Sequence, residues 1–256
     1  MKEKIKIYSR KECIKNPALN FVTLEAFISK KEAPVILVLP GGAYTIVFDH
    51  NEDFGKEPSK FGFNTFVLKY RVNIAAHYPN PLKDVARAIQ YIKANASKYD
   101  IDASKITILG TSAGGHLAAL FASKYQEFES LYNGVKYDLR PKAVILAYPV
   151  ISMESITHKL SRFMLLGPFP SEQTKHDLSV ENCVTKDYPP TFIWACKDDN
   201  VVKYLNSINF IEALRENNIK YNGIIYEKGW HGIGLAKGLE PENWFKEAMH
   251  FIQKIN

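Results

Sequence analysis

The chain has 256 residues, of which 46% are hydrophobic, and this fraction excludes a disordered protein. Its three cysteines are odd in number and lack metal-ligand spacing, so a disulfide scaffold is excluded and no metal site is expected. The net charge of +6 comes from 33 basic and 27 acidic residues that are interleaved along the chain. Proteins that bind nucleic acids usually gather Arg and Lys on one face. We therefore expect no nucleic-acid partner.

The sequence does not predict a secretory signal or a membrane-spanning segment. Residues 1–13 are basic, but no apolar stretch follows them, so we expect no secretory signal. The longest strongly apolar run, residues 33–39, is too short to cross a bilayer. We expect a cytoplasmic protein without a membrane partner.

Short apolar runs rich in β-branched residues recur along the chain. Residues 4–8 and 21–24 are expected to form an antiparallel hairpin at a sheet edge. The later runs are nearly continuous rather than alternating, which is typical of strands covered on both faces. We predict strands over residues 34–39, 65–70, 105–109, 143–148, 191–195 and 223–226.

Segments with apolar residues at helical spacing lie between these strands. We predict helices over residues 81–92, 117–121, 205–214 and 244–252. The repeated strand–helix order predicts a single doubly wound α/β domain over residues 1–256, with a mostly parallel sheet and helices on both faces. Residues 152–188 lack a strand pattern, so we predict a small cap there that packs over one end of the sheet.

The strand at 105–109 leads into Gly110-Thr111-Ser112-Ala113-Gly114, and a helix follows. This is the nucleophile-elbow pattern, in which a sharp turn exposes the serine hydroxyl. Glycine is needed at both ends because side chains there would collide with the neighbouring strand and helix. We predict Ser112 as a nucleophile. The alternative is a serine that only caps the helix.

A serine nucleophile needs a base, and the base needs an orienting acid. Enzymes with this elbow supply them in the order Ser, Asp or Glu, His, from loops after later strands. Asp198 and Asp199 follow one late strand, and His231, alone among seven histidines, follows the next. Successive side chains at a strand end point to opposite sides. Asp199 is the favoured acid, and Asp198 is expected to cap the following helix.

Backbone amides must also stabilise the negative charge that develops on the attacked carbonyl oxygen. The amide of Ala113, directly after the nucleophile, is one candidate. The loop after the strand at 34–39 contains Gly41 and Gly42, and adjacent glycines let the main chain approach a substrate closely. We therefore predict an oxyanion hole made by Gly41, Gly42 and Ala113, and we expect no metal or organic cofactor.

These motifs resemble the acetyl-xylan-esterase-like carboxylesterases of the α/β-hydrolase superfamily, near the hormone-sensitive-lipase-like group. The resemblance extends over residues 33–256 and rests on residues 40–44, 66–71, 110–117, 189–194, 198–199 and 228–236. It implies the α/β-hydrolase fold, with Ser112 as nucleophile, His231 as base and Asp199 as acid. Ala43 departs from the family pattern, because a third glycine usually stands there. This change keeps an amide but narrows the pocket.

Together, the residues and the resemblance predict a serine carboxylesterase. Its expected substrate is a small ester from which a short acyl group, such as acetate, is removed from a sugar or similar alcohol. A xylanase is not expected, because a glycosidase needs two opposed carboxylates and no such pair stands out. A serine peptidase and a non-catalytic small-molecule binding protein of the same fold are the alternatives. Acyl-chain preference stays open, and so does oligomeric state, with a homo-oligomer among the options.

Overall fold

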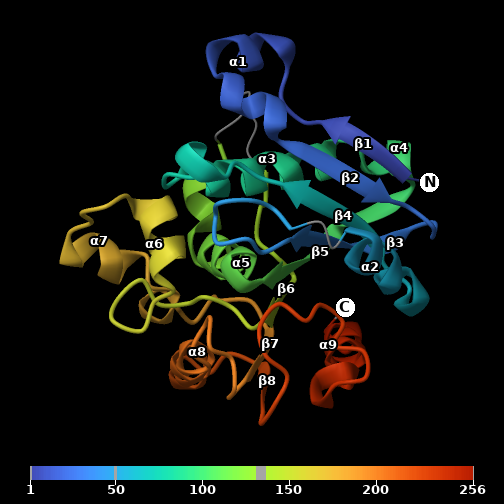
Figure 1. The fold of residues 1–256 in the computed structure, drawn as a ribbon. Coiled ribbons are helices and arrows are strands. Elements are labelled where there is room, and N and C mark those ends of the chain that lie inside the picture. The colour runs from blue at the N-terminus through green and yellow to red at the C-terminus, as the bar shows by residue number, and fades with distance from the viewer. Residues whose placement is uncertain (1, 49–50, 131–136, 256) are drawn as a thin grey trace.

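The described part of the chain forms an eight-stranded sheet that runs through the molecule (Figure 1). The structure is a computed structural model that describes residues 2–48, 51–130 and 137–255. The strands are β1 (Lys2–Lys6), β2 (Thr23–Phe27), β3 (Ala33–Leu39), β4 (Asn64–Lys69), β5 (Ile101–Thr111), β6 (Ala143–Ala147), β7 (Thr191–Cys196) and β8 (Tyr221–Tyr226). Their order across the sheet is β1-β2-β4-β3-β5-β6-β7-β8.

Among the strands that the structure describes, only β2 runs opposite to the others. β1 pairs antiparallel with β2, and β2 pairs antiparallel with β4, whereas all later neighbours are parallel. The predicted antiparallel edge is therefore confirmed. No tight turn joins its two strands; helix α1 (Arg10–Lys15) and a 3₁₀ turn (Pro17–Phe21) lie between them and project beyond the sheet in Figure 1.

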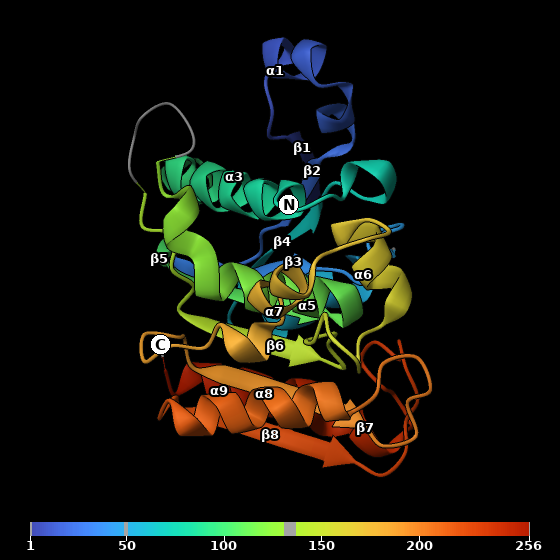
Figure 2. The same ribbon diagram turned by 90° about the vertical axis from the view of Figure 1, so that its left-hand side faces the viewer.

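Helices cover both faces of the sheet (Figure 2). After α1, the helices are α2 (Asn51–Lys56), α3 (Asn80–Ala94), α4 (Ala96–Tyr99), α5 (Ser112–Lys124), α6 (Lys159–Leu166), α7 (Glu172–Asp177), α8 (Leu205–Glu216) and α9 (Trp244–Gln253). Residues of α3, α5 and α8 share one hydrophobic core, and those of α2 and α9 share the other.

The central strands supply both cores because successive side chains point to opposite faces. In β3, Val35 and Leu37 belong to the core under α3 and α5, whereas Ile36 and Val38 belong to the core under α9. All four side chains are fully buried. This arrangement explains the continuous apolar runs in the sequence, and the predicted doubly wound α/β fold is confirmed.

Two regions differ from a simple strand–helix alternation. β5 begins at Ile101, before the predicted start, and its pairing with β3 shifts register between Pro34 and Val35. Residues 152–188 contain α6 and α7 rather than strands, and these helices lie together to one side of α5 in Figure 1. No helix within the described ranges is long and apolar enough to cross a membrane.

Candidate active site

Ser112 lies at the sharp turn from β5 into α5, with a backbone φ of +51°. A β-carbon on Gly110 would come within 2.3 Å of the Gly114 carbonyl oxygen, and one on Gly114 within 2.1 Å of the Leu39 carbonyl oxygen. Glycine is thus required at both positions, as the sequence predicts. The turn holds Ser112 in a left-handed conformation that few residues other than glycine adopt.

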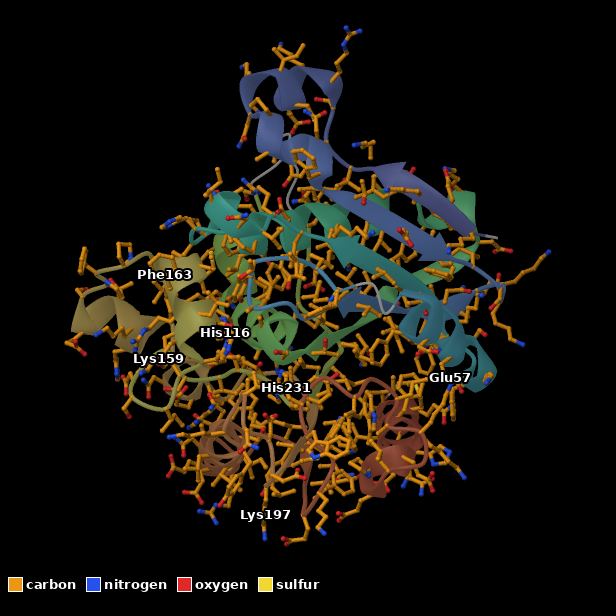
Figure 3. The ribbon with its side chains drawn as sticks, viewed as in Figure 1. Glu57, His116, Lys159, Phe163, Lys197 and His231 are labelled. Atoms are coloured by element: carbon orange, nitrogen blue, oxygen red, sulfur yellow. The ribbon has the colours of Figure 1, made fainter. Side chains whose placement is uncertain are left out.

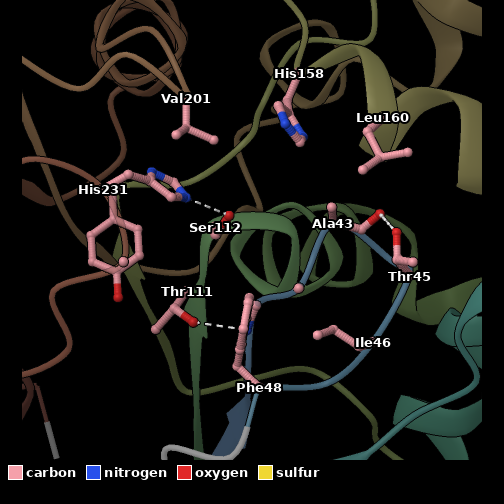
Figure 4. Close-up of a pocket in the computed structure, with 14 residues that line it drawn as sticks. Ala43, Thr45, Ile46, Phe48, Thr111, Ser112, His158, Leu160, Val201 and His231 are labelled. Atoms are coloured by element: carbon pink, nitrogen blue, oxygen red, sulfur yellow. Dashed lines mark hydrogen bonds between the residues drawn. The ribbon is translucent and has the colours of Figure 1, made fainter.

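The structure brings Ser112, His231 and Asp199 into one hydrogen-bonded chain, of which Figure 4 shows the contact between His231 and Ser112. His231 Nε2 is 2.8 Å from Ser112 Oγ, and His231 Nδ1 is 2.6 Å from Asp199 Oδ2. Because a carboxylate can only accept, Nδ1 carries the proton and donates to Asp199. Nε2 of the neutral imidazole is then free to accept the Ser112 hydroxyl proton. This geometry permits nucleophilic attack by the serine.

Further contacts fix the acid and the imidazole. The second oxygen of Asp199, Oδ1, accepts backbone N–H groups of Val201 at 2.8 Å and Val202 at 2.9 Å. The Asp199 side chain is fully buried. The ring of Tyr148 packs against the His231 ring, with centroids 4.9 Å apart and planes at 66°. The carboxylate and the imidazole are therefore both held before any substrate arrives.

Asp198 does not cap a helix, so that prediction is wrong. Its carboxylate accepts the backbone N–H groups of Gly229, at 3.0 and 3.2 Å, and of Trp230 at 3.1 Å. β7 and β8 are parallel neighbours, so the loops after them meet at the same sheet edge. Asp198 does not contact the His231 side chain. It instead binds the backbone of the loop that carries His231.

A second carboxylate that the sequence analysis missed holds the same loop. Glu240 accepts the backbone N–H groups of Glu227 at 3.2 Å and Lys228 at 2.9 Å. The four amides of residues 227–230 are therefore all paired with carboxylates. Glu240 lies in a 3₁₀ turn near α9, and nothing in its local sequence indicates this contact.

The loop after β3 approaches Ser112, but the amide of Gly41 is already occupied. It donates to Thr111 Oγ1 at 2.9 Å, as the dashed line in Figure 4 shows. This contact contradicts the prediction that Gly41 supplies an oxyanion donor, because a hydroxyl across the turn takes its N–H. The amides of Gly42 and Ala113 remain as candidates; Ala113 lies in the first turn of α5, where N–H groups have no acceptor within the helix.

A cavity of about 280 Å³ opens over Ser112 and His231. Apart from the triad, its walls are mostly apolar. One wall comes from the loop after β3, and the other comes from residues 152–188 and the loop after β7 (Figure 4). Its lining residues are Gly41, Gly42, Ala43, Thr45, Ile46, Phe48, Thr111, Ser112, Tyr148, His158, Leu160, Val201, His231 and Gly232.

His116, which Figure 3 labels near α5 and α6, joins the loop after β3 to residues 152–188 through its two ring nitrogens. Its Nε2 is 2.9 Å from the Leu178 carbonyl, which only accepts, so Nε2 carries the proton. Nδ1 therefore accepts the Tyr44 hydroxyl at 2.9 Å. Burial lowers the pKa of His116 to about 4, so the ring is neutral at pH 7. The His116 side chain is fully buried.

The residues within the described ranges include no group of three or more His, Cys, Asp or Glu side chains placed to hold a metal ion. What the geometry does assemble is a serine, a histidine and an aspartate at the carboxyl edge of a doubly wound sheet, which defines a protein of the α/β-hydrolase fold. The crystal structure of an acetyl ester-xyloside bifunctional hydrolase from Caldicellulosiruptor lactoaceticus matches it with a TM-score of 0.91 and 34% identity, covering 99% of this chain and 96% of that one.

The chain belongs to the BD-FAE family, whose model matches residues 25–214. It is 38% identical to an endo-1,4-beta-xylanase B of Butyrivibrio fibrisolvens over 82% of this chain and 34% of the relative. It is 29% identical to an acetylxylan esterase of Xylanibacter ruminicola over 86% of this chain and 44% of the relative. The chain thus spans less than half the length of these two relatives.

Proposed function

We propose that the protein is a carboxylic ester hydrolase with Ser112 as nucleophile, His231 as general base and Asp199 as the orienting acid. The observation that carries this proposal is the continuous chain of contacts from Asp199 through His231 to Ser112, at 2.6 and 2.8 Å. The same chain occurs in serine hydrolases of unrelated folds, so it is recognised by geometry.

In this mechanism, Ser112 Oγ attacks the ester carbonyl carbon while its proton passes to His231 Nε2. The carbonyl oxygen becomes an oxyanion and accepts hydrogen bonds from the amides of Gly42 and Ala113. The intermediate collapses, the bond to the alcohol oxygen breaks, and His231 gives its proton to the departing alcohol. Water then attacks the acyl-serine with His231 again as base, which releases the acid and restores Ser112.

We propose that the acyl group is short, acetate above all, and that the alcohol is a sugar or a similar compound. The cavity of about 280 Å³ lies just below the usual range for ligand pockets, which begins at about 300 Å³. Two of the similar proteins are named for acetyl esters. Residues 152–188 would act as the cap of this pocket, since His158 and Leu160 from that segment line it.

Of the two activities in the names of the relatives, ester hydrolysis is the one this pocket supports. Glycoside hydrolysis normally uses a pair of carboxylic acids on opposite sides of the scissile bond. Within the part of the chain that the structure describes, none of the residues lining the cavity is Asp or Glu. Asp199 is buried behind His231 and does not line the cavity.

The test is hydrolysis of p-nitrophenyl acetate by the protein and its Ser112→Ala variant. The variant should lose a factor of about 10⁶ in kcat, as other triads do. Ser123→Ala is the matched control, because Ser123 lies on the same helix α5 but outside the cavity. It should retain the rate.

Full hydrolysis by Ser112→Ala would refute the assigned nucleophile. Butyryl and octanoyl esters extend the test to the acyl group, and their rates should fall with chain length. A fluorophosphonate probe that leaves Ser112 unlabelled in the folded protein would instead favour a non-catalytic binding protein. Faster cleavage of aminoacyl-arylamides than of acetyl esters would favour a peptidase.

A further inference from the structure

His158 brings a polar ring into an otherwise apolar wall of the cavity. It directly precedes α6 and lines the cavity together with Leu160 and Val201. Figure 4 shows its imidazole reaching from this wall toward the space above Ser112. The Ser112–His231–Asp199 mechanism gives His158 no role.

The imidazole of His158 is held by one of its two nitrogens. Nδ1 is 2.8 Å from Ser161 Oγ, and the Ser161 side chain is fully buried on α6. Burial and, to a smaller extent, the neighbouring His231 lower the pKa of His158, and Asp199 offsets only part of this shift. The ring is therefore neutral at pH 7 and carries one proton. Because Nδ1 is paired with Ser161, Nε2 is the nitrogen that remains for a ligand.

A hydroxyl group is the ligand that matches Nε2 in either tautomer. The Ser161 hydroxyl can donate to Nδ1, in which case Nε2 carries the proton and donates. It can also accept from Nδ1, in which case Nε2 accepts. A substrate hydroxyl can play both complementary roles, whereas an alkyl group can play neither and would cover Nε2 without pairing it, at a cost in binding.

The position of His158 assigns this hydroxyl to the alcohol half of the ester. His231 must deliver its proton to the departing alcohol, so the alcohol lies on the His231 side of Ser112. His158 and His231 line the same cavity, and Figure 4 shows both imidazoles beside the space above Ser112. The opposite wall comes from the loop after β3. Apart from Thr45, the side chains that this loop offers, such as Ile46 and Phe48, are apolar.

We infer that His158 is a specificity-determining residue that binds a hydroxyl group of the leaving alcohol near the ester oxygen. The preferred substrates are then monoacyl esters of polyhydroxylated alcohols, such as partly acetylated sugars, rather than esters of simple alkyl or cycloalkyl alcohols. This inference rests on the proposed function, because it assumes that Ser112 attacks an ester in this cavity.

The first test compares kcat/KM for a mono-O-acetyl methyl β-xyloside and for cyclohexyl acetate, which offers a six-membered ring without hydroxyls. In His158→Phe, which keeps a flat ring, the ratio of the two values should fall about tenfold, the effect of one lost neutral hydrogen bond. His158→Gln, which restores a donor and an acceptor, should recover part of the ratio. Lys159→Ala alters the next residue, which is exposed and does not line the cavity, and should leave the ratio within about twofold.

A ratio in His158→Phe that equals the wild-type ratio would overturn the inference. A second readout does not need turnover: the ¹H–¹⁵N signals of the His158 ring in Ser112→Ala, assigned by their loss in the double variant with His158→Phe. The acetylated xyloside should shift these signals, and cyclohexyl acetate should not. If the wild type hydrolyses neither ester, the proposed function is wrong, and this titration alone decides whether His158 binds a hydroxylated ligand.

Discussion

The two loops that face each other across Ser112 are held in opposite ways. The loop with His231 is held by charged groups, because the carboxylates of Asp198 and Glu240 accept the backbone N–H groups of residues 227–230. The loop after β3 is held by hydrogen bonds to uncharged side chains. Tyr44 on that loop is fully buried and donates to His116, and the Gly41 amide donates to Thr111 Oγ1.

This difference separates two demands on the site. His231 must carry a positive charge for part of the proposed cycle, and carboxylates beside its loop and at its Nδ1 favour that charge. The loop after β3 must present amides without charge or movement to a developing oxyanion, and buried neutral hydrogen bonds suit that task. Variants in the loop with His231 and variants in the loop after β3 should therefore lose activity in different ways.

The largest effect on the histidine side is expected from Asp199→Asn. The amide no longer forces the proton onto Nδ1 of His231, so kcat should fall by a factor of about 10⁴ while the fold is kept. Steady-state kinetics on p-nitrophenyl acetate and a circular dichroism melt check both parts. Asn200→Ala, at an exposed neighbouring position, is the control. A loss below tenfold would remove Asp199 from the role of acid.

On the opposite side, Gly42→Ala should cost a factor of about 10²–10³ in kcat, the value of one oxyanion donor. Gly42 has a φ of +135°, and an added β-carbon would come within 2.1 Å of the Ile46 carbonyl oxygen, so the loop must move. The control is Gly62→Ala, because Gly62 also has a positive φ but has open space around it and does not line the cavity. Equal losses in the two variants would point to general destabilisation.

A smaller effect is expected from Asp198→Ala, which releases the amides of Gly229 and Trp230 but leaves the triad side chains intact. We expect kcat to fall about tenfold with KM nearly unchanged, because the imidazole is less well positioned for proton transfer. Asp198→Asn keeps an acceptor oxygen and should recover most of the rate. Identical losses in the two variants would argue against a role for these hydrogen bonds.

His116, the neutral histidine that holds the loop after β3, should make the stability of the fold depend on pH. The pKa of His116 is about 4 in the folded protein and near 6.5 when unfolded, so the unfolded chain binds more protons between these values. Its contribution is present above pH 6.5 and is lost as pH falls toward 4, by about 2 kcal/mol between pH 7 and 5. Urea unfolding should show this loss reduced in His116→Gln and retained in His250→Gln. Equal pH dependence in all three proteins would contradict it.

Most of the strands and the meeting of Ser112, His231 and Asp199 could be predicted, because they depend on strand order and on local patterns. The roles of Asp198 and Gly41 could not. Alternation along a strand says that Asp198 points away from His231, but only the pairing of β7 with β8 shows what it meets there. The Gly41–Thr111 contact joins residues 70 positions apart and has no local pattern.

Segments without a periodic apolar pattern could not be predicted as well. The early part of β5, residues 102–105, is mostly polar and lies at a register shift, so it does not resemble a buried strand. The path of residues 152–188 was equally hidden. His158 lines the cavity, whereas Phe169 from the same segment is 95% exposed and lies outside it.

The loop of His231 also contains a built-in optical reporter. Trp230, which lies beside His231, is 63% exposed, whereas Trp194 and Trp244, the other two tryptophans of the chain, are fully buried. An aqueous collisional quencher such as iodide therefore reaches one indole out of three. Quenching of tryptophan emission can thus follow this loop during ligand binding or unfolding, with no dye attached and no residue replaced.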